Sequence, residues 1–177
     1  DPSSAWHPVP VCASAEIRWW LQHRESLTRL IQERCQQFHV EPVFQALATV
    51  CIDELAIMNL SRLQQAMVRE VYLYSDGVPV VFAHSVVKSG HLRGAWRSLS
   101  RLGNQSLGSM LFSNPLIRRS PFSYKKLRTG HLLYDRACKR LAIRPVNLWA
   151  RRSLFTLQAQ PILVTEIFLP KIHNLRR

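Results

Sequence analysis

Residues 151–170 read RRSLFTLQAQPILVTEIFLP and predict two β-strands close to the C-terminus. The strands cover residues 153–157 and 162–169, and the short polar segment 158–161 joins them. In the second strand alternate side chains point to opposite faces, and both faces are apolar apart from one threonine and Glu166. A strand that is apolar on both faces is typical of the centre of a sheet, so we expect the sheet to be built around it.

Glu166 is out of place in that strand, because its neighbours on either face are aliphatic or aromatic. Burying a carboxylate in such surroundings is costly unless the group is paired, protonated or used in chemistry. It is also the only acid that follows Asp135 in the chain. These features make Glu166 the first candidate for a functional residue.

Length and composition fit one domain, residues 1–177, because a chain of 177 residues with 47% hydrophobic content can bury a substantial core. No apolar run approaches the roughly 18 residues that cross a bilayer, and the first residues lack the features of a secretory signal. We therefore expect a cytoplasmic monomer without stable membrane insertion, in which residues 1–13 are extended or poorly ordered.

The formal net charge of +13 is concentrated in the second half of the chain. Residues 77–177 hold 18 Lys and Arg but only two acids, Asp135 and Glu166. One explanation of this imbalance is an anionic partner: a nucleic acid, an acidic membrane surface or a small substrate with several carboxylates. The other explanation is an ordinary basic surface that binds no particular partner. The basic stretch 118–152 lacks an RNA-binding signature and no helix offers polar base readers, so we expect no nucleic acid.

Cysteine and histidine spacing gives no sign of a metal. The four cysteines lack C-x-x-C pairing and the seven histidines lack ligand spacing, so we expect free thiols and no metal site. Phosphate-binding glycine loops and the G-x-S-x-G motif are also missing, which excludes most nucleotide-binding and serine-hydrolase readings.

The first third of the chain predicts mainly helices. Ser14 caps a helix that runs to about residue 23, and Ser26 caps a second helix whose apolar positions continue to Phe38. Residues 40–53 are compatible with a strand, and residues 54–65 with either a loop or a short helix.

A β-hairpin is predicted next, with strands 68–74 and 78–87 joined by a Ser-Asp-Gly turn. Its first strand places Arg69 on the same face as Val71 and Leu73. A guanidinium at the edge of a core suits bidentate capture of a carboxylate, although a structural arginine on the rim fits the pattern too.

A helical hairpin follows the strands. Residues 91–102 predict a helix that ends at Gly103, and Ser106 caps a further short helix, LGSMLF. The second helix is too short and apolar to read DNA, so we expect the pair to lie over a pocket.

Four segments carry a resemblance to a known family. They are REVYL with DGVP at residues 69–79, LGNQSLGSMLF at 102–112, LWARRS at 148–153 and PILVTEIFLP at 161–170. The family is chorismate lyase, whose pattern in the last region is close to L-W-x-R-R-S followed by P-L-L-L-T-E-x-F-L-P. The resemblance covers roughly residues 16–170.

The resemblance implies an α+β fold, a single antiparallel β-sheet with helices and a helical-hairpin flap covering an internal ligand site. It implies an enzyme, a carbon–oxygen lyase that removes pyruvate from chorismate to give 4-hydroxybenzoate for ubiquinone synthesis, with no metal or redox cofactor. An enclosed apolar site would retain the aromatic product, so slow release and product inhibition are expected.

The resemblance also implies site residues. By position, Arg69 holds the ring carboxylate and Glu166 meets the ring 4-hydroxyl, so both are expected catalytic residues. Leu107 in the flap and Leu27, where family members often have Met, are expected to contact substrate or product. Residues 121–145 depart from the family pattern and are expected to be an insertion. Glu166 could orient the hydroxyl, protonate the departing ether oxygen or act as a base, and these roles stay open.

Two other functions remain open. A small-molecule sensor domain of similar fold, as in certain transcription regulators, should follow a winged-helix DNA-binding segment, and the residues before Arg69 show none. An RNA- or membrane-binding protein based on residues 118–152 should bind polyanions in a salt-sensitive way.

Overall fold

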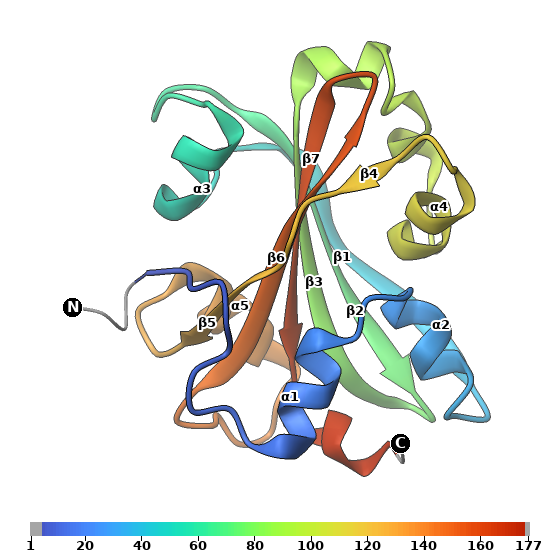
Figure 1. Ribbon diagram of the computed structural model, residues 1–177, viewed down its shortest axis with the longest axis vertical. Helices are drawn as coiled ribbons and strands as arrows, with labels where there is room; N and C mark the ends of the chain where they lie inside the picture. The colour runs from blue at the N-terminus through green and yellow to red at the C-terminus, as the bar shows by residue number, and fades with distance from the viewer. Residues whose placement is uncertain (1–4, 176–177) are drawn as a thin grey trace.

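The computed structural model describes residues 5–175, which form one antiparallel β-sheet with short helices on both faces (Figure 1). The strand order is β1-β2-β3-β7-β6-β4, and β5 also pairs with β6. The predicted α+β fold with a single antiparallel sheet is confirmed. The strands are β1 (Phe38–Ala48), β2 (Ala66–Ser75), β3 (Val78–Lys88), β4 (Arg118–Arg119), β5 (Ser123–Leu127), β6 (Leu148–Leu157) and β7 (Gln160–Phe168).

β7 lies between β3 and β6, which confirms the central position predicted for this strand. The hairpin that it forms with β6 differs from the prediction in two ways. β6 begins at Leu148 instead of residue 153, and the link is the two-residue turn Gln158-Ala159. Both turn residues have positive φ, 50° and 61°, as a tight type I′ connection requires.

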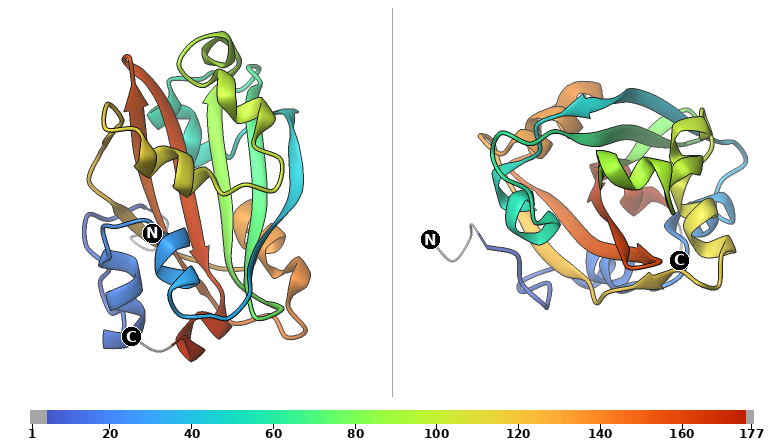
Figure 2. Two further views of the ribbon diagram at one scale, coloured as in Figure 1. Left: turned by 90° about the vertical axis from the view of Figure 1, so that its right-hand side faces the viewer. Right: turned by 90° about the horizontal axis from the view of Figure 1, so that it is seen from above.

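The two faces of the sheet are covered by different helices (Figures 1 and 2). Apolar side chains of α1, α2 and α4 pack on the face that carries Val71 and Phe155. Side chains of α3 and α5 pack on the face that carries Tyr72 and Leu163. The helices are α1 (Ala15–Gln22), α2 (Leu27–Gln32), α3 (Ile52–Met58), α4 (Leu107–Ser113) and α5 (Leu132–Ala137).

The β2–β3 hairpin agrees with the prediction. Its turn residues Asp76 and Gly77 have φ of 49° and 77°, a left-handed conformation that glycine adopts without strain and that aspartate tolerates. The Asp76 carboxylate also accepts hydrogen bonds from the backbone N–H groups of Gln36 and Gln37, at 2.9 and 2.8 Å. The turn is therefore tied to the segment that leads into β1.

The second predicted helix is shorter than its apolar pattern indicated. α2 ends at Gln32, and Phe38, predicted as its last apolar position, instead begins β1. Pairing of Phe38 with Ser75 and the bonds to the Asp76 carboxylate hold this segment extended. The strand predicted within residues 40–53 and the short helix allowed for 54–65 correspond to β1 and α3.

The helix predicted for residues 91–102 is wrong in type. The segment forms two 3₁₀ helices, Ser89–Arg93 and Arg97–Arg101, separated by Gly94 in a non-helical conformation. The side chain of Gln160 at the start of β7 occupies the space beside Gly94, where a Cβ would lie 2.9 Å from Oε1. Gln160 also accepts the Ala95 N–H and the indole N–H of the next residue, which fixes the break.

The two ends of the predicted single domain can be placed only in part. Residues 1–13 were predicted to be extended or poorly ordered. Residues 1–4 of this segment lie outside the described residues. From residue 5 to 13 the chain has no helix or strand, and His7 forms an isolated antiparallel bridge with Tyr124. Residues 121–145, the expected insertion, contain β5 and α5. No helix within residues 5–175 combines the length and apolar character needed to cross a membrane.

Candidate active site

A pocket lies between the sheet and the helices α2 and α4. β2, β3, β6 and β7 form its floor, and its lining is mainly aliphatic and aromatic. Its free volume is small, about 50 Å³. The lining residues are Leu27, Thr28, Arg69, Val71, Leu73, Ala83, Ser85, Ser106, Leu107, Gly108, Leu111, Phe112, Phe155, Val164 and Glu166.

All four site residues predicted from the sequence line this one pocket. They come from four separate elements: Leu27 begins α2, Arg69 lies in β2, Leu107 begins α4 and Glu166 lies in β7. The strand residues reach it because period-two alternation sends Arg69 and Glu166 to the same face of the sheet. The structure therefore brings the predicted residues together.

Arg69 is held rigidly at the pocket. Its Nη1 donates to Gln45 Oε1 at 2.8 Å, and its Nη2 donates to the carbonyls of Gly103 and Gln105, both at 3.0 Å. Within the described part of the chain its Nε has no hydrogen-bond partner, and the residue is 5% exposed. Burial lowers the pKa of Arg69, since the charged form loses solvation. The guanidinium is thus oriented and buried, and no carboxylate among residues 5–175 forms an ion pair with it.

Glu166 is paired with an arginine that the sequence reasoning did not select. Arg151 of β6 lies opposite Glu166, and its Nε donates to Glu166 Oε2 at 2.5 Å. Arg151 is 1% exposed, and its Nη1 donates to the carbonyls of Trp20, Leu21 and His23 at the end of α1. The carboxylate is therefore not the lone buried acid that its sequence neighbours indicated.

Arg151 could have been found from the length of the hairpin turn. The two-residue turn pairs Leu157 with Gln160, and counting back places Arg151 opposite Glu166. The predicted four-residue link instead places Ser153 opposite Glu166, because hairpin register follows loop length. The error in loop length hid the ion pair.

Two hydroxyl groups join the helices that cover the pocket. Thr28 Oγ1 of α2 lies 2.5 Å from Ser106 Oγ, the residue that precedes α4, and both residues are buried. Gly108 lies against them, and a Cβ at that position would come within 3.0 Å of Thr28 Oγ1. This hydrogen bond links α2 to the start of α4 beside the pocket.

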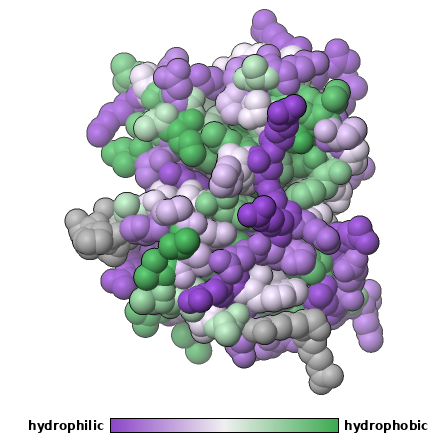
Figure 3. Space-filling view, viewed as in Figure 1, coloured by the Kyte–Doolittle hydropathy of each residue, from purple (hydrophilic) through white to green (hydrophobic). Residues whose placement is uncertain are grey.

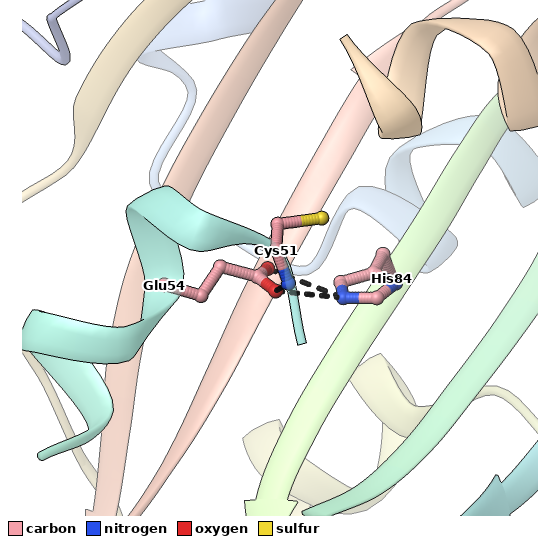
Figure 4. Close-up of side chains that lie close together, drawn as sticks. All are labelled: Cys51, Glu54 and His84. Carbon is pink, nitrogen blue, oxygen red and sulfur yellow. Dashed lines mark hydrogen bonds and ion pairs between the residues drawn. The ribbon is translucent and has the colours of Figure 1, made fainter. Parts of the chain in front are cut away.

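The opposite face of the sheet holds a cluster of ligand-type side chains (Figure 4). Among residues 5–175, Cys51, Glu54 and His84 form a buried group whose ligand atoms lie within 4.8 Å of one another. His84 Nε2 is 3.1 Å from Glu54 Oε1, and His84 Nδ1 is 2.9 Å from Glu70 Oε1. Arg136 completes the group by an ion pair with Glu70.

The imidazole of His84 lies between two carboxylates in this cluster. Burial alone would lower the pKa of His84, but Glu54 and Glu70 outweigh it and raise the pKa to about 9. Near neutral pH both ring nitrogens then carry hydrogens and donate to the two carboxylates. The protonated imidazole joins α3 to the sheet between two carboxylates.

The molecular surface is largely polar on the side seen in Figure 3, with apolar residues in separate patches among hydrophilic ones. Several basic residues of the stretch 118–152 are engaged with the protein itself. Lys125 and Arg152 are buried, and Lys125 Nζ lies 3.2 Å from Asp53 Oδ2. Part of the basic stretch is therefore structural.

Comparison with known proteins gives the family. The sequence profile described as "Chorismate lyase" matches residues 5–177. A protein of Nitrosomonas eutropha named "Probable chorismate pyruvate-lyase" is 67% identical over 175 residues, covering 99% of this chain and 98% of that protein. A protein of Nitrosospira multiformis with the same name is 62% identical over 173 residues, covering 97% and 96%.

Solved structures of low identity share the fold. The C-terminal domain of PhnF superposes with a TM-score of 0.60 at 17% identity, covering 85% of this chain and 93% of that one. The C-terminal domain of the histidine utilization repressor from Pseudomonas syringae gives 0.58 at 12% identity, covering 80% and 95%. These likenesses concern the fold alone. The family profile and the close relatives confirm the resemblance first seen in the strand motifs, and the chain belongs to the chorismate lyase family of enzymes.

Proposed function

We propose that this chain removes pyruvate from chorismate and leaves 4-hydroxybenzoate, the first committed step towards ubiquinone. The observation that carries the proposal is the pocket in which Arg69 and Glu166, fixed on two strands, meet Leu27 and Leu107 from two covering helices. The ring of the product carries a carboxylate at one end and a hydroxyl at the other. The guanidinium of Arg69 suits the carboxylate, and the carboxylate of Glu166 suits the hydroxyl.

The reaction fits a site of this composition. The C3–O bond of chorismate breaks and C4 loses its proton, so the ring becomes aromatic. The departing enol of pyruvate gains a proton at its methylene carbon. Nothing is oxidised or reduced overall, so the chemistry requires no redox cofactor. The protein has to position the ring, stabilise charge and move a proton.

Arg69 is suited to fix the ring carboxylate. Gln45 and two backbone carbonyls hold its terminal nitrogens, and its Nε has no partner among the described residues. A guanidinium that is held in place before the ligand arrives loses little entropy on binding. Leu107 and Leu27 then contact the ring from the covering helices.

Glu166 is suited to meet the 4-hydroxyl. Arg151 holds one of its carboxylate oxygens and thereby orients the group towards the pocket. From this place Glu166 orients the hydroxyl, protonates the ether oxygen or accepts the ring proton, three roles that a pH–rate profile separates.

The cover of the pocket favours slow release of the product. The Thr28–Ser106 hydrogen bond joins the two helices, and the aliphatic and aromatic lining suits an aromatic acid. Opening must break this contact, so we expect product release to limit turnover and 4-hydroxybenzoate to inhibit.

The proposal is tested by mixing the purified protein with chorismate, without added metal or nucleotide, and following 4-hydroxybenzoate by absorbance. Formation of stoichiometric 4-hydroxybenzoate and pyruvate supports it. Folded protein that yields no product contradicts it.

A second candidate function is a non-catalytic small-molecule sensor domain, favoured by the fold shared with the C-terminal domains of transcription regulators. It predicts that chorismate or an aromatic acid raises the melting temperature while no pyruvate appears. The cytoplasmic location and the monomeric state remain proposals, and light scattering coupled to size exclusion tests the second.

A further inference from the structure

Chorismate presents a second carboxylate that Arg69 does not account for. This inference rests on the proposed function. The second carboxylate belongs to the enolpyruvyl group on C3, next to the C4 hydroxyl. If Arg69 holds the ring carboxylate and Glu166 the hydroxyl, the side chain leaves the ring beside Glu166. A cation is needed at that end of the pocket, because a buried carboxylate without a partner is costly.

Arg119 lies at that end. It belongs to β4 and pairs with Phe155 of β6, which lines the pocket. Its guanidinium carbon is 5.4 Å from the ring centre of Phe112 and 5.8 Å from that of Phe155, both of them lining residues. On another side it stacks on Phe122 at 4.4 Å. The cation therefore lies against two of the aromatic rings that line the pocket.

The charge of Arg119 is poorly compensated. Its Nη2 donates to the carbonyl of Arg24 at 2.6 Å, and within residues 5–175 it forms no ion pair with a carboxylate. Burial lowers the pKa of Arg119, and the nearby charge of Arg151 lowers it further. The ring centre of Phe122 lies 4.4 Å from the guanidinium carbon of Arg119 and 4.3 Å from that of Arg151, the partner of Glu166, so Arg119 lies near that ion pair. An arriving anion is stabilised at such a site.

We propose that Arg119 binds the carboxylate of the enolpyruvyl group and that this contact selects chorismate over aromatic acids without the side chain. Arg151 is less suited to this role, because its Nε already donates to Glu166 and its Nη1 to three backbone carbonyls. Arg24 offers only an exposed side chain beside the same surface.

Arg119 also borders the outside of the molecule. It lines a surface pocket of about 500 Å³ together with Gln22, Arg24, Phe122 and Tyr124. Pyruvate carries the second carboxylate away when the C3–O bond breaks. The guanidinium of Arg119 can therefore stay bound to the pyruvate carboxylate while pyruvate passes from the internal pocket to this surface pocket.

The experiment compares Arg119→Met with Arg118→Met. Methionine keeps much of the arginine stem without its charge, and Arg118 is the exposed neighbour in the same short strand. For each variant we measure KM and kcat with chorismate, the dissociation constant of 4-hydroxybenzoate, inhibition by pyruvate and the melting temperature. Arg119→Lys tests whether a charge without the planar fork restores binding.

We expect Arg119→Met to raise the KM for chorismate by about 10- to 100-fold, the effect of one lost charge-assisted hydrogen bond. The dissociation constant of 4-hydroxybenzoate, which lacks the second carboxylate, should stay within about twofold. The KM of Arg119→Lys for chorismate should fall between those of the wild type and Arg119→Met. Inhibition by pyruvate should weaken only in the Arg119 variants. Arg118→Met should match the wild type in every measurement.

Two results overturn the inference. One is an unchanged KM for chorismate in Arg119→Met, and the other is an equal loss of affinity for chorismate and 4-hydroxybenzoate, which marks a structural role. Failure of the proposed function looks different, because the wild-type protein would then form no 4-hydroxybenzoate at all.

Discussion

Arg151 and Glu166 face each other across the β6–β7 hairpin, and their side chains form an ion pair at the edge of the pocket. Arg151 is buried while the Glu166 side chain is 21% exposed, so the two charges differ in their access to solvent. Arg151 also binds three carbonyls at the end of α1. One side chain thus connects the candidate catalytic carboxylate to a helix at the other end of the sequence.

Replacing Arg151 by Met should destabilise the fold. The change leaves Glu166 and three carbonyls without their donor, and breaking a buried ion pair from one side costs about 3–5 kcal/mol. Denaturant unfolding measures the loss, and Arg151→Lys should recover part of it. In the double variant with Glu166→Gln the two losses should not add, since the residues interact directly. Simple additivity would show that the pair contributes no coupling energy.

Replacing either candidate catalytic residue should abolish most turnover. We expect Glu166→Gln and Arg69→Ala each to lose about 100-fold or more in kcat, the scale of removing one positioned acid–base or electrostatic group. The absorbance assay for 4-hydroxybenzoate measures this, and the exposed Arg62→Ala serves as the control for Arg69. Wild-type rates in both variants would show that the site is elsewhere.

Replacing Thr28 by Val should speed the release of product. The change removes the hydrogen bond to Ser106 that joins α2 and α4, worth about 1 kcal/mol, so the off-rate of 4-hydroxybenzoate should rise about fivefold. Stopped-flow dilution of the preformed complex gives this rate. Ser109→Ala, an exposed hydroxyl of α4, should leave it unchanged. Equal off-rates in all three proteins would place the rate-limiting opening at another contact.

Stability should fall between about pH 6.5 and pH 9 because of His84. Its pKa is raised to about 9 in the folded protein, above the ordinary value near 6.5, chiefly by Glu54 and Glu70, which outweigh burial. The stabilisation is complete below the unfolded value and is lost as the pH rises through the folded one, on the order of 3 kcal/mol. Burial raises the pKa of Cys51, which therefore stays a neutral thiol over this range.

Urea unfolding at pH 6.5 and pH 9.5 measures this dependence. His84→Gln should flatten the profile, while His173→Gln, at a more exposed histidine, should keep the wild-type slope. An equal free energy of unfolding of the wild type at both pH values would mean that His84 is neutral in the fold.

Side-chain facing in the strands could be predicted from the sequence, and register could not. Arg69 and Glu166 line one pocket although the predicted strand ends differ from the observed ones, because alternation does not depend on where a strand begins. The partner of Glu166 depends on the number of residues in the turn. The predicted four-residue link and the observed two-residue turn differ by only two residues, yet they pair Glu166 with different residues. The sequence therefore singles out Glu166 as a candidate but does not identify Arg151 as its partner.

Contacts between distant segments explain the other differences. The apolar spacing of residues 91–102 is helical, but Gln160 fixes a break at Gly94 from across the sheet. Phe38 has helical spacing from α2, yet pairing with Ser75 draws it into β1. In both cases a partner far away in the sequence outweighs a local preference, which a single sequence does not reveal.

The turn at Gln158 and Ala159 limits how this family can vary in length. One inserted residue there would reverse the facing of every β6 side chain, so Arg151 would leave Glu166 and point towards His84 on the far side of the sheet. Two inserted residues would keep each β6 side chain on its present face, but they would shift the pairing so that Arg151 no longer lies opposite Glu166. We therefore expect evolutionary insertions and deletions to be accepted in connections such as 121–145, while the hairpin keeps its two-residue turn.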